Sequence, residues 1–97
     1  MEFVYIVYED MYEESDLICV PSTVFERISQ LAQEFLNWLP DADDPEYYEY
    51  TNGRKVIVCT TDGFVKWLNS YVCNHPIACQ VVSRGIPCKY DHKIVEF

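Results

Sequence analysis

The side chains with the most specific chemistry are cysteines and histidines in the last quarter of the chain. They follow the pattern Cys73-x-His75-x3-Cys79-x8-Cys88-x3-His92. Thiolate and imidazole groups are common zinc ligands, but structural zinc sites often use a Cys-x2-Cys turn to hold two thiolates on one metal. This chain has no such turn. Unpaired thiols are therefore the favoured interpretation, and a zinc site or a disulfide, Cys73–Cys79 or Cys79–Cys88, is the alternative.

The number of cysteines, five, is odd, and no basic leader followed by an apolar stretch and a cleavage site is visible. Both features favour reduced thiols and predict a cytoplasmic location. Cys19 and Cys59 lie within apolar segments, so we expect them to act as small core residues. No apolar run approaches the ~20 residues that a membrane-spanning helix needs.

Acidic side chains are the second feature of interest, because they are unevenly distributed. The formal net charge is −9, from 16 acidic and 7 basic residues. The first 50 residues have 13 acids and a single base, Arg27, whereas the remaining residues have three acids and six bases. Such asymmetry points to an interaction surface. Ten of the acids form two clusters, Glu9, Asp10, Glu13, Glu14 and Asp16, and Asp41, Asp43, Asp44, Glu46 and Glu49.

Two interpretations of these clusters remain open. Both lie where loops are expected, so they are either ordinary solubilising charge or one face directed at a basic partner. Neighbouring tyrosines favour the second interpretation, because tyrosine is enriched at protein interfaces. Direct binding of nucleic acid or an acidic membrane is disfavoured by charge repulsion. The candidate partner-binding residues are Glu9, Asp10, Tyr12, Glu13, Glu14, Asp16, Asp41, Asp43, Asp44, Glu46, Tyr48, Glu49 and Tyr50.

Calcium and catalysis are weaker hypotheses. The segment 41–46 is rich in oxygen ligands, but an EF-hand needs glycine at its sixth position and glutamate at its twelfth. Those positions hold Glu46 and Asn52, so only weak calcium attraction is left as an alternative. No glycine-rich phosphate-binding motif and no Gly-x-Ser-x-Gly motif occurs, and no cofactor is expected. Cys–His pairs are too common in such a chain to indicate an enzyme.

The apolar pattern predicts strands and helices in alternation. Residues 2–8 are apolar on both faces, which is typical of an inner strand, and residues 17–20 are expected to pair with them. An apolar stripe at helical spacing predicts a helix over 22–39, capped by Ser22 or by Thr23 with Glu26 three residues later, and ended by Pro40.

The second half begins with a hairpin. Asn52-Gly53 lies between two strand-like flanks, 47–51 and 54–60, and this dipeptide readily adopts a type I′ turn. Thr60 or Thr61 is expected to cap a helix over about 61–73, followed by strands near 78–83 and 88–97.

This order predicts a single α+β domain over residues 1–97. Its elements run β-β-α-β-β-α-β-β, with a largely antiparallel sheet that includes the hairpin and two helices on one face. The length of 97 residues and the hydrophobic content of 49% are sufficient for one folded core.

The function predicted from these features is non-enzymatic. The chain is expected to be a protein-binding module, most simply an inhibitor that inserts its acidic, tyrosine-rich face into the basic groove of a nucleic-acid-binding protein or nuclease. Phage anti-defence proteins and immunity proteins are settings for such an inhibitor. A small metal-binding protein of the calcium type, or a regulatory protein, is the alternative.

Overall fold

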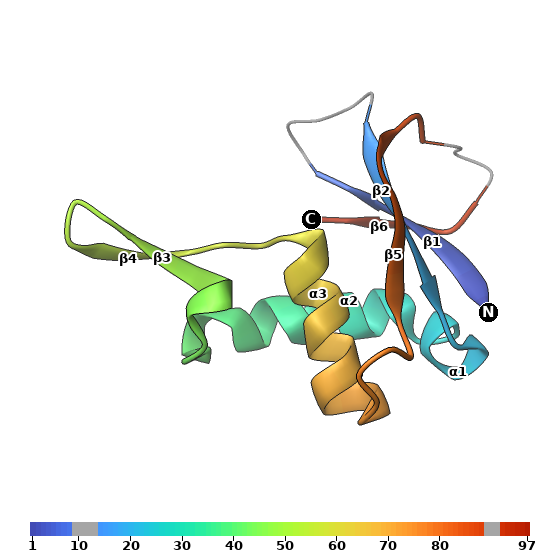
Figure 1. The fold of residues 1–97 in the computed structure, drawn as a ribbon, viewed down its shortest axis with the longest axis horizontal. Helices are drawn as coiled ribbons and strands as arrows, with labels where there is room; N and C mark the ends of the chain where they lie inside the picture. The colour runs from blue at the N-terminus through green and yellow to red at the C-terminus, as the bar shows by residue number, and fades with distance from the viewer. Residues whose placement is uncertain (9–13, 89–91) are drawn as a thin grey trace.

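The structure, a computed structural model, describes residues 1–8, 14–88 and 92–97 (Figure 1). Its main sheet has four strands in the order β5-β2-β1-β6, and two further strands form a separate hairpin. The strands are β1 (Glu2–Val7), β2 (Ser15–Val20), β3 (Tyr48–Thr51), β4 (Arg54–Ile57), β5 (Gln80–Ile86) and β6 (Ile94–Glu96). The α-helices are α1 (Ser22–Phe25), α2 (Ile28–Trp38) and α3 (Thr61–Trp67). The predicted α+β class and its alternation of strands and helices are confirmed.

Strand β1 is an inner strand of the main sheet, as its sequence predicts. It pairs antiparallel with β2 on one side and parallel with β6 on the other. Val4 and Ile6 are fully buried on one face, and Tyr5 is 7% exposed on the other, which explains why apolar residues are required in succession. On the far side of β2, strand β5 pairs antiparallel and completes the sheet.

The hairpin has the predicted turn but not the predicted location. Asn52 and Gly53 adopt positive φ angles of 52° and 76°, as a type I′ turn requires, and β3 pairs antiparallel with β4. The expectation that this hairpin joins the main sheet is wrong, because β3 and β4 pair only with each other among the described strands. Figure 1 shows the hairpin extending away from both the sheet and the helices.

The helices also depart from the prediction at one point. The expected helix over 22–39 is interrupted by a turn at Glu26 and Arg27, where the Arg27 N–H bonds to the carbonyl of Val24, three residues back. Neither expected cap is used at its start, because Pro21 occupies the N-cap position without a side-chain hydrogen bond.

Helix α3 follows its prediction more closely. The Thr60 hydroxyl accepts a hydrogen bond of 2.9 Å from the Gly63 N–H, which is the predicted cap. The helix continues as a π-helical segment over Leu68–Cys73 and ends at Asn74, whose φ of 51° is left-handed. No helix in the described part of the chain is long and apolar enough to cross a bilayer.

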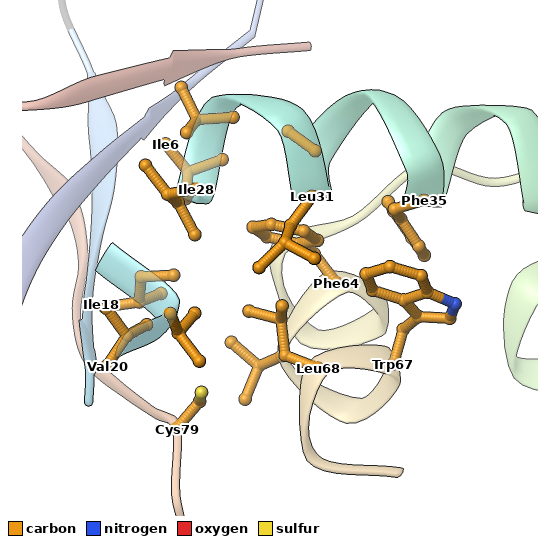
Figure 2. Close-up of a cluster of buried hydrophobic side chains, with 14 of the residues drawn as sticks. Ile6, Ile18, Val20, Ile28, Leu31, Phe35, Phe64, Trp67, Leu68 and Cys79 are labelled. Carbon is orange, nitrogen blue, oxygen red and sulfur yellow. The ribbon is translucent and has the colours of Figure 1, made fainter. Parts of the chain in front are cut away.

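The core lies between the main sheet and helices α2 and α3. Figure 2 shows Ile6, Ile18 and Val20 of the sheet facing side chains of the helices, which include Ile28, Leu31 and Leu68. Both helices therefore cover the same sheet face. This core is completed by an aromatic cluster centred on Phe35.

Phe35 of α2 is fully buried and connects four parts of the fold. Its ring lies 5.3 Å from Phe64 and 5.6 Å from Trp67, both in α3, measured between ring centroids. The same ring lies 6.0 Å from Phe97 after β6 and 6.3 Å from Tyr47, which precedes the hairpin. One side chain thus holds α3, the C-terminal segment and the hairpin base against α2.

We expect Phe35→Ala to lower the free energy of unfolding by about 3–5 kcal/mol, because it leaves a cavity among these rings. Phe3→Ala is the matched control. Phe3 is 52% exposed, so the same truncation there is expected to cost about 1 kcal/mol or less. Chemical denaturation of the two variants measures both values, and equal losses would contradict the assignment of Phe35 to the centre of the core.

Candidate partner-binding surface

The first acidic cluster is described only in part. Glu9, Asp10, Tyr12 and Glu13 lie outside the described residues, so the prediction that both acidic clusters form one face stays a prediction. Glu14 is exposed immediately before β2.

The Asp16 carboxylate of this cluster already accepts hydrogen bonds within the domain. It accepts a hydrogen bond of 2.5 Å from the Thr61 hydroxyl and one of 3.2 Å from the Gly85 N–H. The Thr61 proton points at Asp16, so the Tyr8 hydroxyl, 2.6 Å away, is the donor to the Thr61 oxygen. Burial raises the pKa of Tyr8, so its proton is retained at neutral pH. Asp16 therefore joins β2 to the start of α3, which gives it a structural role.

The second acidic cluster is held on two short 3-10 turns, Leu39–Asp41 and Pro45–Tyr47. Ala42 and Tyr47 are buried, so they fix the backbone while the acids between them remain at the surface. Asp44 begins the second turn, and its carboxylate accepts a hydrogen bond of 3.0 Å from the Glu46 N–H. The proline at position 45 favours this turn because its ring restricts φ.

Lys66 of α3 partly neutralises this cluster. Its ammonium group donates to the Asp44 carboxylate at 2.8 Å and also to Glu46. The hydrogen bond from Lys66 is the main reason why the pKa of Asp44 is lowered, and the two carboxylates together raise the pKa of Lys66. The exposed carboxylates of Asp41, Asp43 and Glu49 form no ion pair within the described residues.

The hairpin continues directly from this cluster. The Tyr48 hydroxyl donates to the Asp43 carbonyl at 3.2 Å. From β4, the Lys55 ammonium group lies 4.5 Å from the centre of the Tyr48 ring and donates to the Ala42 carbonyl at 3.2 Å. These contacts attach the acidic segment to the root of the hairpin, so the two parts form one surface.

Tyr50 lies further out on the hairpin and is the most exposed aromatic side chain of the described residues. Its exposed fraction is 68%, and its ring packs edge-on against Tyr48 at 5.7 Å between centroids. We call the region formed by these residues the acidic–tyrosine surface, and its members are Asp41, Asp43, Tyr48 and Tyr50, together with Glu49 on the opposite face of the same strand.

A groove between α3 and β5 was not anticipated from the sequence. It has a volume of about 980 Å³. Its charges are paired: Arg84 of β5 binds Asp62 through two hydrogen bonds of 2.7 and 2.6 Å, and Lys66 binds Glu46. The spacing of Asp62 and Lys66, four residues apart on one helix, is a signal that they share a face.

Asn69 lines this groove and binds the backbone of the segment 76–79. It is 8% exposed, and its amide donates to the carbonyls of Pro76 and Cys79 while its oxygen accepts from the Cys79 N–H at 2.7 Å. No buried side-chain polar atom of the described residues lacks a hydrogen-bond partner. The described residues that line the groove therefore direct no unsatisfied buried side-chain polar atom at a ligand.

The thiols are all free. Cys59 is partly buried and packs against the core, which agrees with the prediction, whereas Cys19 is half-buried outside the core cluster and Cys79 is the fully buried cysteine. Burial raises the pKa of Cys59 to about 11 and that of Cys79, which contacts Cys73, to about 12. Both stay protonated at neutral pH, a form that neither attacks substrates nor binds metals well. No group of three or more histidine, cysteine or acidic side chains is placed to hold a metal ion within residues 1–8, 14–88 and 92–97.

Comparisons with known proteins add no relative. No family model matches the chain, and no curated protein or solved structure matches it.

We expect Lys66→Met to raise the pKa of Asp44 toward its ordinary value, because methionine keeps the apolar stem and removes the ammonium group. The lowered pKa means that the native pair adds stability above the ordinary carboxyl pKa and loses it as the pH falls through the folded-state value. A pH titration of the Asp44 carboxyl carbon by NMR measures the shift.

Lys55→Met is the matched control for this titration. Lys55 contacts the same segment through the Ala42 carbonyl, so its loss removes a nearby charge but no donor to Asp44. An unchanged Asp44 pKa in Lys66→Met, or an equal rise in both variants, would contradict the direct ion pair.

Proposed function

We propose that this chain is a non-enzymatic protein-binding module that uses the acidic–tyrosine surface to bind a basic protein. The observation that carries the proposal is Tyr50, a large aromatic side chain 68% exposed on a projecting hairpin, next to carboxylates that form no ion pair within the described part of the chain. An amphipathic ring bordered by charges is the composition of a binding hot spot, in which the ring supplies affinity and the charges supply orientation.

The partner chemistry follows from the charge of this surface. Asp41, Asp43 and Glu49 are exposed and negative, so a partner rich in arginine and lysine is favoured over nucleic acid or an anionic membrane. Such basic surfaces are common where proteins bind phosphates. The specific form of the proposal is an inhibitor that occupies the basic groove of a nucleic-acid-handling protein such as a nuclease. Phage anti-defence and immunity systems are settings in which this chemistry is useful.

The hairpin itself supports a binding role. An isolated two-stranded hairpin is only marginally stable in water, and exposed apolar side chains on it cost solubility. Here Tyr50 is exposed on a strand that adds little to the core. A partner that covers this side chain would account for its retention on the surface.

The test is quantitative affinity capture from the native host with three forms of the chain. The first is wild type, the second carries Asp41→Lys, Asp43→Lys and Glu49→Lys, and the third carries Glu26→Lys, Glu34→Lys and Glu96→Lys. The third form has the same net charge as the second, but its changes lie at exposed positions elsewhere. We expect a basic partner to be captured by the first and third forms and lost from the second. Equal capture by all three forms, or equal loss from both variants, would overturn the proposal.

Binding kinetics measured with the purified partner then distinguish the contribution of the charges from that of the apolar contact. Charge reversal is expected to slow association and to reduce its salt dependence, because attraction between exposed charges is screened beyond ~8 Å at physiological ionic strength. Tyr50→Ala is expected instead to raise the dissociation rate at all salt concentrations, because it removes buried apolar contact. Displacement of nucleic acid from the partner tests the inhibitor form of the proposal.

A further inference from the structure

The outer edge of strand β4 is an unpaired strand edge with exposed apolar side chains. Among residues 1–8, 14–88 and 92–97, β3 and β4 pair only with each other. Val56 is 41% exposed and Ile57 is 38% exposed. Unpaired edges of this kind recruit a further strand, and natural proteins usually block them with charge, proline or a bulge.

The register of the hairpin determines which backbone groups are available at this edge. The two-residue turn makes Thr51 and Arg54 a hydrogen-bonded pair, and the bond from the Val58 N–H to the Tyr47 carbonyl, 3.0 Å long, preserves this alternation at the other end. The N–H and carbonyl groups of Lys55 and Ile57 therefore point away from β3.

These outward groups suit one antiparallel arrangement with a second copy of the same strand. When Lys55 of one copy pairs with Ile57 of the other, both sets of outward groups are satisfied by about four hydrogen bonds. Val56 then lies opposite Val56 of the second copy, on the two-fold axis. This is an isologous contact, in which each copy uses the same patch.

The opposite edge of the hairpin does not allow the same contact. On β3 the outward residues are Tyr48 and Tyr50, so antiparallel self-pairing would place Glu49 opposite Glu49 of the second copy. Two carboxylates facing each other across strands are destabilising, whereas two β-branched apolar side chains are favourable. Of the two edges of the hairpin, only the β4 edge is therefore compatible with self-pairing of this kind.

We propose that two copies of this chain associate through β4 into a four-stranded sheet in the order β3-β4-β4-β3. The distribution of charge also fits this arrangement. Each hairpin tip carries Arg54 and Lys55, and antiparallel pairing brings it toward the hairpin base of the other copy, where the second acidic cluster lies. Ile57 gains contact with the aliphatic stem of Lys55 across the interface.

Glu49 and Tyr50 stay accessible in this dimer, because they lie on β3, at the outer edges of the combined sheet. The dimer would therefore present two copies of this β3 edge. Self-association is measured on the purified chain alone, so its failure leaves the proposed function intact, and the loss of partner binding leaves the dimer intact.

The interface is small, and stable dimers usually bury more than ~1,200 Å². We therefore expect a dissociation constant on the order of 10–100 μM. Sedimentation equilibrium should show the average mass rising from 11.4 kDa toward about twice that value with concentration. A mass that stays at 11.4 kDa up to about 1 mM overturns the proposal.

The variant Val56→Lys tests whether Val56 lies on the two-fold axis of the dimer. Within one chain the new ammonium group faces Glu49 across the hairpin, which favours folding, but between copies it opposes its own counterpart. The dissociation constant is expected to rise about tenfold or more. An unchanged constant in a variant with a wild-type circular dichroism spectrum overturns the proposed axis.

A pair of cysteine variants tests the register independently. Val56→Cys and Glu49→Cys lie directly opposite each other on one face of the hairpin, but only position 56 lies on the axis. Under oxidation by diamide, which takes up the two protons and two electrons released by the thiols, Val56→Cys is expected to give a disulfide between the two copies at position 56. Peptide mapping by mass spectrometry identifies this bond against the native cysteines. Equal linkage of both variants, or faster linkage of Glu49→Cys, overturns the register.

Discussion

The packing of Phe35 against aromatic rings from several segments is the interaction on which the remaining structure depends. It holds α3 against α2 through Phe64 and Trp67, and it fixes the hairpin base through Tyr47. Gly63 lets the Tyr47 ring pack closely against the start of α3. A Cβ at position 63 would lie 3.4 Å from the Tyr47 ring and 3.0 Å from the Thr60 hydroxyl oxygen. A hairpin that projects from the domain needs such a rigid base, since its own two strands supply little stability.

The same packing determines which acidic side chains form contacts within the domain and which stay exposed to solvent. Once α3 is in place, Lys66 neutralises Asp44 and Glu46, and Thr61 binds Asp16. These acids organise turns and strand ends, so they are less available to a partner than their number in the sequence indicates. Within the described residues, Asp41 and Asp43 on the segment that leads into the hairpin, and Glu49 in β3, form no ion pair. These exposed carboxylates belong to the acidic–tyrosine surface, so they are the charges that the proposed basic partner would meet.

The two edges of the hairpin differ in the side chains and backbone groups that they expose. The β3 edge combines Tyr48, Glu49 and Tyr50 and continues from the acidic turns, which suits a basic partner. The β4 edge presents Val56 and Ile57 with outward backbone groups from alternate residues, which suits strand addition. The two proposed contacts would therefore use different edges of one short element, because its two strands have separate edges.

The sequence by itself determined the local elements, because their causes are local. Asn52-Gly53 specifies the turn through its positive φ angles, Thr60 caps α3, and apolar residues on both faces mark β1 as an inner strand. Tertiary structure alone decided the location of the hairpin outside the main sheet, the parallel pairing of β1 with β6, and the pairing of Lys66 with Asp44 and Glu46, about 20 residues away. These features depend on contacts between segments that are distant in the sequence. The apolar pattern of a strand indicates how many of its faces are buried, but not which strand it pairs with. The position of a charged residue in the chain likewise does not indicate its ion-pair partner.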